Sequence, residues 1–271
     1  MRRLLPVLCS LALVSGVALG APPEAFQLRR APCVRGERWE VVTSTRVERD
    51  PRTTSPQLLA HGGEFTETTS RVRYALLDAG AGDRVRLEVA QAAQDLVACI
   101  GGRRVRETEP PRRAVLEGPA RELLPGEVGP VSLLARGRVR VGEVWTSEAT
   151  LPVGGVALVP VRLRTAVRAA RREGKRALLR VTIQGRGQAV APDGGRVEVE
   201  LRGVLEVDPA AVDRPERATL VYRVAVRGGG GPPVATRTTV RVETRPLPGP
   251  QGAPAVVAES ARGGLEGDRA R

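Results

Sequence analysis

Aromatic side chains are scarce in this chain of 271 residues. Phe, Trp and Tyr together make up 2% of it, with two of each. Proteins that bind single-stranded nucleic acid stack the bases on aromatic side chains, and glycosidase clefts use the same rings as platforms for sugars. We therefore expect no nucleic-acid partner. Carboxylates are plentiful, but no pair of them stands out in the sequence as a general acid and base, so a carboxylate-based hydrolase is the least favoured of the function classes considered.

Histidine is almost absent, which limits both catalysis and metal binding. His61 is the only one, and it lies beside Gly62-Gly63 in an expected loop. One histidine without a cysteine cluster cannot build the usual metal sites. A serine triad would need His61 as its base, and no serine lies in a G-x-S-x-G turn. The sequence thus predicts no catalytic residue and no metal.

The glycine-rich segments lack the context of a phosphate-binding loop. Gly185-Arg186-Gly187 lies between strand patterns, and the glycines at 228–231 precede two prolines rather than a helix. Phosphate loops present backbone N–H groups at the start of a helix. Both segments are therefore interpreted as turns, and no cofactor is expected.

Lysine and asparagine are also nearly missing, although the formal net charge is +13. Lys175 is the only lysine among 43 basic residues, and there is no asparagine. A GC-rich genome produces this composition through its codons, and arginine then fills ordinary surface positions. The arginines alternate with apolar residues instead of forming runs. We interpret them as a solvated face, and an anionic partner is the alternative.

Only one long apolar run occurs, at the very start of the chain. Arg2 and Arg3 precede an apolar segment that extends to Leu19, and small residues flank the expected cleavage site before Ala21. This pattern predicts a secretory signal peptide over 1–20 and export to the periplasm or the exterior. No later segment reaches eighteen consecutive apolar residues, so the processed chain is not expected to span a membrane.

Two cysteines follow the predicted signal peptide, Cys33 and Cys99. In an oxidising compartment an even pair indicates a disulfide. A Cys33–Cys99 bond is therefore predicted, and two separate buried thiols are the alternative.

Strict alternation of apolar and polar residues is the main structural signal. In each segment that shows it, one face of the expected strand is apolar and the other is polar. The segments are 38–48, 71–76, 84–89, 179–184, 196–202, 220–227 and 240–243. Short turns with Gly and Asp separate them, which favours an antiparallel meander. The expected fold is mainly β, either one large curved sheet resembling a half-barrel or two packed β lobes.

The domain boundaries follow from composition. We expect a flexible leader over 21–32, a β domain over 33–245 and a disordered tail over 246–271, which is rich in Pro, Gly and charge. Within the domain, an irregular connection over 110–130, with a short helix near 121–124, separates possible sub-lobes at 33–109 and 131–245. Residues 165–175 fit either a long strand or a three-turn helix, and the alternation favours the strand.

A short motif occurs in both halves. Gly36-Glu37 precedes Trp39, and Gly142-Glu143 precedes Trp145. We interpret both Trp rings as plugs at the ends of a sheet core. Contact with a ligand is the alternative for these rings and for the two tyrosines, Tyr74 and Tyr222.

These features resemble a family of exported bacterial β-sheet domains of unknown function. The resemblance rests on Gly142 to Trp145, the polar hairpin over 176–195 and the strand from Val197 to Asp208, with a fainter copy over 36–93. It implies an exported β-sheet domain and no catalytic residue. In architecture the long strands are also similar to the half-barrels of lipoprotein carriers, whose curved sheet holds acyl chains.

The sequence thus favours an exported, non-enzymatic envelope protein. We expect it to bind a hydrophobic ligand or another envelope protein through a curved sheet face. The alternative is a structural or interaction domain with no ligand pocket. The oligomeric state is left open.

Overall fold

The computed structural model describes residues 24–50, 63–79, 84–124, 133, 136–153, 157–174, 176–228 and 231–248. The predicted signal peptide over 1–20, His61 and the predicted tail beyond residue 248 lie outside these residues, so nothing in the structure bears on them.

Within the described residues the chain forms fourteen strands and one short helix. In chain order they are β1 (Ala25–Gln27), β2 (Arg38–Arg49), β3 (Phe65–Ala79), β4 (Arg84–Gln91), β5 (Gln94–Ile100), β6 (Arg103–Glu109), β7 (Arg112–Pro119), α2 (Ala120–Leu123), β8 (Arg138–Arg140), β9 (Val144–Val153), β10 (Ala157–Glu173), β11 (Arg176–Val190), β12 (Arg196–Val207), β13 (Arg217–Gly228) and β14 (Gly231–Pro246).

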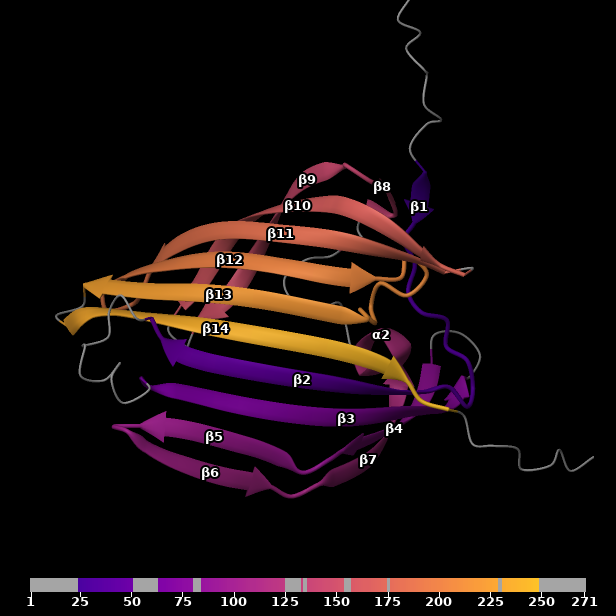
Figure 1. Cartoon of the computed structure of the whole chain (residues 1–271), viewed down its shortest axis with the longest axis horizontal. Helices are drawn as coiled ribbons and strands as arrows, with labels where there is room; N and C mark the ends of the chain where they lie inside the picture. Colours follow the sequence, from indigo (N-terminus) through magenta and orange to yellow (C-terminus); the bar gives the residue numbers. More distant parts are fainter. Residues whose placement is uncertain are drawn as a thin grey trace, which may run out of the picture.

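Twelve of these strands form a single antiparallel sheet. Its order is β6-β5-β3-β2-β14-β13-β12-β11-β10-β9, and β4 and β7 branch off β3 (Figure 1). The predicted mainly β fold, an antiparallel meander that forms one large curved sheet, is confirmed. Because β14 pairs with β2 over eleven residue pairs, the two halves are continuous and do not form separate lobes.

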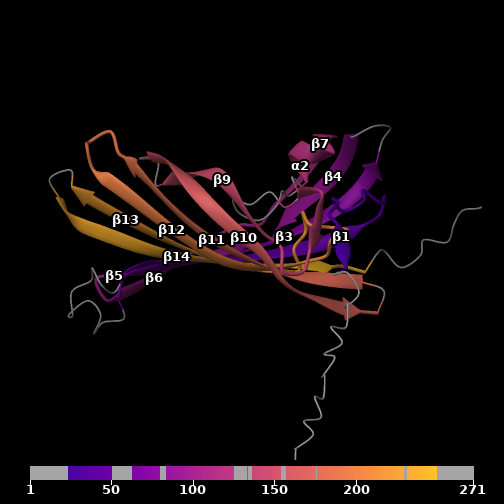
Figure 2. The same cartoon turned by 90° about the horizontal axis from the view of Figure 1, so that it is seen from above.

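The sheet forks at β3. The first part of β3 pairs with β5, and the second part pairs with β4, which pairs in turn with β7. Figure 2 shows the result: β4 and β7 rise on the same side as α2 and β9, whereas β5 and β6 lie on the other side. We call the side with α2 and β9 the inner face.

The inner face is apolar because the alternation places most of the buried apolar side chains there. On β12, for example, Val197, Val199 and Leu201 are buried. Glycines on this face let neighbouring strands approach closely where the sheet bends. A Cβ atom on Gly187 would lie 2.2 Å from the Pro160 carbonyl oxygen, and one on Gly203 would lie 2.4 Å from Leu220 Cδ2. Larger residues at these two positions would force the strands apart.

The leader is ordered from residue 24 onward, so the prediction of a flexible leader over 21–32 is wrong for its described part. β1 pairs with β8 as a separate two-stranded sheet. The following segment is held by backbone bonds, since Arg29 N donates to Pro209 O at 2.7 Å and Ala31 N donates to the Asp213 carboxylate at 2.7 Å. Phe26 and Leu28 are buried in the core cluster, which supplies the apolar burial that orders this segment.

The region predicted to be irregular contains a strand. β7 occupies Arg112–Pro119, which corrects the expected irregular connection there, because the unpaired edge of β4 provides a partner along its whole length. The short helix is confirmed as α2 at Ala120–Leu123. Residues 165–173 continue β10, which confirms the strand interpretation.

The predicted disulfide is not formed. Cys99 pairs with Phe65 at the start of β3, whereas Cys33 packs with Trp39 and Leu76 near the other end of that strand. Eleven residues of extended chain separate Phe65 from Leu76, roughly 35 Å at the usual rise. A disulfide needs Cα atoms within about 7 Å of each other. The prediction is therefore wrong, because the sequence carries no signal for which end of a long strand each cysteine occupies.

Candidate functional site

A groove lies on the inner face, between the edge strand β9 and the strands β12, β13 and β14. It has a volume of about 520 Å³. The curvature of the sheet brings the end of β9 opposite strands that are not its neighbours in the sheet. The groove is lined by Leu151, Pro152, Val153, Val197, Val199, Tyr222, Val224, Val226, Thr236 and Thr238.

The lining carries no formal charge. Charged residues make up 27% of the chain, yet none of the ten lining residues is charged. The polar atoms of its side chains are the hydroxyl groups of Tyr222, Thr236 and Thr238. An apolar hollow with a few hydroxyl groups suits a hydrocarbon ligand with little polarity of its own.

The groove is open because the inner face is covered unevenly. At the end of β9 where the strand begins, Phe26 and Leu28 of the leader and Val139 of β8 belong to the same buried cluster as Trp145. At the opposite end of β9, Val153 pairs with Ala157. There, the groove-lining residues of β12 and β13 lie near the turns that join these strands to β11 and β14. The leader and β8 therefore close one end of the curved face and leave the other end hollow.

Tyr222 is the one aromatic residue of the four predicted candidates that lines the groove. Its ring is partly buried among valines of the inner face, and burial raises the pKa of its phenol above the ordinary value because the charged form would lose hydration. The phenol therefore stays neutral at physiological pH, in keeping with the uncharged lining.

Trp39 and Tyr74 lie elsewhere, in a second buried cluster against β4 and α2. Their rings stack with centroids 5.2 Å apart and planes 10° from parallel. Trp39 is 2% exposed, and Leu76 and Leu87 belong to the same cluster. This ring plugs a core, as the sequence interpretation proposed, and so does the buried ring of Trp145.

The repeated Gly-Glu motif builds the same local structure twice. Gly36 and Gly142 both have positive φ, at 82° and 88°. In the first copy the backbone N–H of Gly36 donates to Leu76 O and that of Leu76 donates to Glu37 O; in the second, Gly142 and Glu143 form the equivalent two bonds with Val167.

Each copy also holds an arginine between its glutamate and its tryptophan. Arg214 pairs with Glu37 at 2.6 Å and lies 3.8 Å from the centre of the Trp39 ring. Arg136 pairs with Glu143 and lies 5.3 Å from the centre of the Trp145 ring. Both clusters are stabilising contacts in which the cation meets the ring face. The sequence showed the Gly, Glu and Trp of this motif but could not show the arginines, because Arg214 lies far away along the chain.

In the described part of the chain, no group of three or more His, Cys, Asp or Glu side chains is placed to hold a metal ion. Among the same residues, no helix has the length and apolar character needed to cross a bilayer.

Half of the ten residues that line the groove could not be placed from the sequence. Leu151, Pro152 and Val153 were assigned to no strand, and Thr236 and Thr238 lie on a segment whose alternation was followed only from Val240. The alternation of β12 and β13 did place their valines on one face. It could not show that β9 faces them across the groove, because that depends on the curvature of the whole sheet.

Comparison with known proteins adds no relative: no protein-family model, no curated protein and no solved structure matches the chain.

Proposed function

We propose that the inner groove binds the hydrocarbon chain of a lipid and that the protein is a non-enzymatic lipid-binding protein of the bacterial envelope. The observation that carries the proposal is the uncharged lining in a chain that is otherwise rich in charge. A volume of about 520 Å³ lies within the range of small-molecule sites. The predicted export signal supports an envelope location, where acyl chains are abundant.

The energetics favour a chain-like ligand. Each methylene moved from water into an apolar site contributes about 0.8 kcal/mol, which corresponds to about a fourfold gain in affinity. A ligand that threads between Val153 of β9 and Val224 of β13 would bury methylenes along its length, while the hydroxyl groups of Thr236 and Thr238 remain available to a polar end.

The proposal is tested by isothermal titration of the purified protein with saturated fatty acids of increasing chain length. Affinity is expected to rise about fourfold per added methylene until the groove is filled. Organic extraction of the protein purified from a bacterial envelope, followed by mass spectrometry, should release lipid.

A matched pair of variants locates the binding. Val224→Trp fills the groove and should weaken the binding of the fatty acid by about tenfold or more, because an overfilled site must distort to admit a ligand. Thr219→Trp places the same ring on the same strand but on the opposite, exposed face, and should leave the affinity unchanged. Absence of both fatty-acid binding and extracted lipid would contradict the proposal, as would equal affinity in the two variants.

A further inference from the structure

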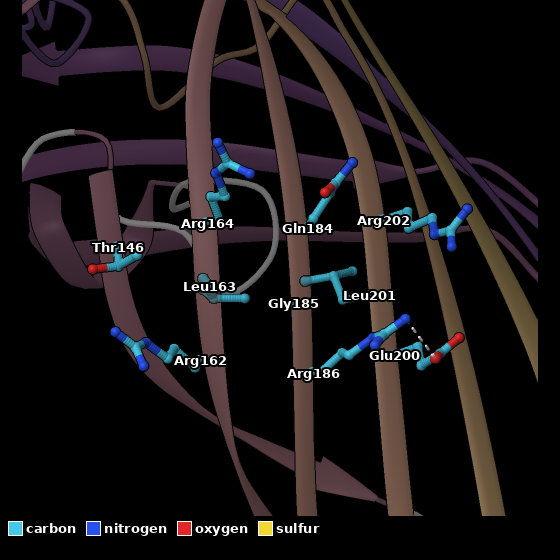
Figure 3. A pocket seen from close by; sticks show the side chains of 10 residues that line it. All are labelled: Thr146, Arg162, Leu163, Arg164, Gln184, Gly185, Arg186, Glu200, Leu201 and Arg202. Carbon is cyan, nitrogen blue, oxygen red and sulfur yellow. Dashed lines mark ion pairs between the residues drawn. The ribbon is translucent and has the colours of Figure 1, made fainter. Parts of the chain in front are cut away.

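A second hollow lies on the outer face of the sheet, over β9 to β12. Its volume is about 630 Å³. Figure 3 shows the residues that line it, most of which stand in three rows across the strands. Arg164, Gln184 and Arg202 form one outer row; Arg162, Arg186 and Glu200 form the other; and Leu163, Gly185 and Leu201 lie between them.

The strand register explains these rows. Arg164 pairs with Gln184, which pairs with Arg202, and Arg162 pairs with Arg186, which pairs with Glu200. In the middle row, Leu163 and Leu201 have their side chains buried on the inner face, and Gly185 has no side chain. Their backbone therefore forms the floor of the hollow, and the long side chains of the two outer rows form its walls. We call this hollow the arginine groove.

The charges in the arginine groove are unbalanced. It holds four arginines and one acid, and Glu200 pairs with Arg186 at 3.4 Å. Among the residues that the structure describes, no carboxylate lies within 4.0 Å of the other three guanidinium groups, those of Arg162, Arg164 and Arg202. All four arginines are exposed.

Several arginines elsewhere on the outer face pair with acids. Arg223 on β13 pairs with Asp50, and this hydrogen bond raises the pKa of the Arg223 guanidinium. Arg73 pairs with Glu40 at 2.9 Å. Facing arginines also occur there, since Arg223 pairs with Arg237 across the strands, but each of these two contacts an acid. In the arginine groove, Arg162 stands directly opposite Arg186 on the neighbouring strand and has no acidic partner among the described residues. Like charges in this position destabilise a sheet, so the groove keeps a repulsion that an anion would relieve.

We propose that the arginine groove binds a phosphate ester group. The two outer rows are two residues apart along each strand, about 7 Å, so a group between them lies within reach of arginine side chains from both rows. A phosphate monoester or diester presents two or three terminal oxygens and accepts bidentate bonds from arginine. A carboxylate, like a phosphate diester, has two terminal oxygens, whereas a phosphate monoester has three and can accept bonds from both rows at once. Because the arginine groove lies on the face opposite the lipid groove, this proposal stands independently of the proposed function.

The phosphate ester could belong to a soluble molecule or to a lipid headgroup, and the test separates these sources. Full-length mature protein is titrated with glycerol 3-phosphate at low salt, and, separately, mixed with vesicles of phosphatidylglycerol or of phosphatidylcholine. Binding of glycerol 3-phosphate points to a soluble ester. Binding of phosphatidylglycerol vesicles alone points to a headgroup. Either conclusion requires that the Arg164→Gln variant binds the probe more weakly than the unsubstituted protein.

The variants distinguish a built site from general attraction to a positive surface. Arg164→Gln removes one charged donor and should lower the affinity about tenfold or more. Arg241→Gln makes the same charge change at another exposed arginine of the outer face, on β14, and should change the affinity less than twofold. Glu200→Gln removes the competing carboxylate and should strengthen binding, which a purely structural role for Glu200 would not produce.

Three results would overturn the proposal. The first is the absence of binding to either probe. The second is an equal loss of affinity in Arg164→Gln and Arg241→Gln, which would mean that only the overall charge attracts the anion. The third is equal binding to phosphatidylglycerol and phosphatidylcholine vesicles without any response to glycerol 3-phosphate.

Discussion

Arg214 shows how one residue can hold two distant segments together. It lies in the turn between β12 and β13, contacts the ring of Trp39 and pairs with Glu37. Its side chain is 7% exposed, while that of Arg136 in the equivalent cluster is 42% exposed. Several buried polar atoms of the first cluster lack a hydrogen-bond partner within the structure, among them Arg214 Nε and Trp39 Nε1. Its stability therefore depends on the ion pair and on the contact between cation and ring.

This difference in burial gives a prediction at the scale of single residues. Arg214→Ala leaves Glu37 without its partner and removes the cation from the Trp39 ring. It should lower the free energy of unfolding by about 2–3 kcal/mol, somewhat less than for a fully buried pair because Glu37 is partly exposed. Arg136→Ala, in the exposed copy, should cost below about 1 kcal/mol. Denaturation in urea measures both, and equal losses would contradict this account of the two clusters.

At the scale of elements, β1 covers the core although it has only three residues. It is joined to β8 by antiparallel pairing, and Phe26 places its ring in the main buried cluster, 7% exposed. The leader therefore acts as part of the domain and closes one end of the inner face.

The contribution of β1 is measured by Phe26→Ala, with Gln27→Ala as the control on the exposed neighbour. Loss of the buried ring should lower the free energy of unfolding by about 3 kcal/mol, and the control should change it by less than about 0.5 kcal/mol. If thermal and urea unfolding show no difference between the two variants, β1 does not stabilise the core in solution.

The elements also show what the sequence could and could not predict. Alternation identified β12 and β13 because each has a buried inner side and a polar outer side. The leader was misjudged because Phe26 and Leu28 alternate with Gln27 and Arg29 over only four residues, which is too short to indicate a strand. The segment is held by contacts with residues 137–140 and 209–213. The strand β7 was hidden by prolines at 110 and 111, which end β6 but permit a new strand directly afterwards.

At the scale of the whole molecule, the pairing of β14 with β2 joins the strands of the two halves of the chain into one curved sheet. The sequence predicted its local strands, but this pairing joins residues about 200 positions apart and no local pattern specifies it. The same continuity produces two different faces: an inner face with an uncharged groove and an outer face with an arginine groove. The curvature that creates the inner groove is a property of the whole sheet, because the groove is lined by four of its strands.

The central claim is that the inner groove holds a hydrocarbon chain, and its most direct test is a crystal structure of the protein with a fatty acid brominated near its methyl end. Anomalous scattering locates the bromine without reference to the protein density. We predict the bromine between β9 and β13, within contact distance of Val153 or Val224. Bromine found only on the outer face, or an ordered inner groove without bromine at saturating ligand, would contradict the account.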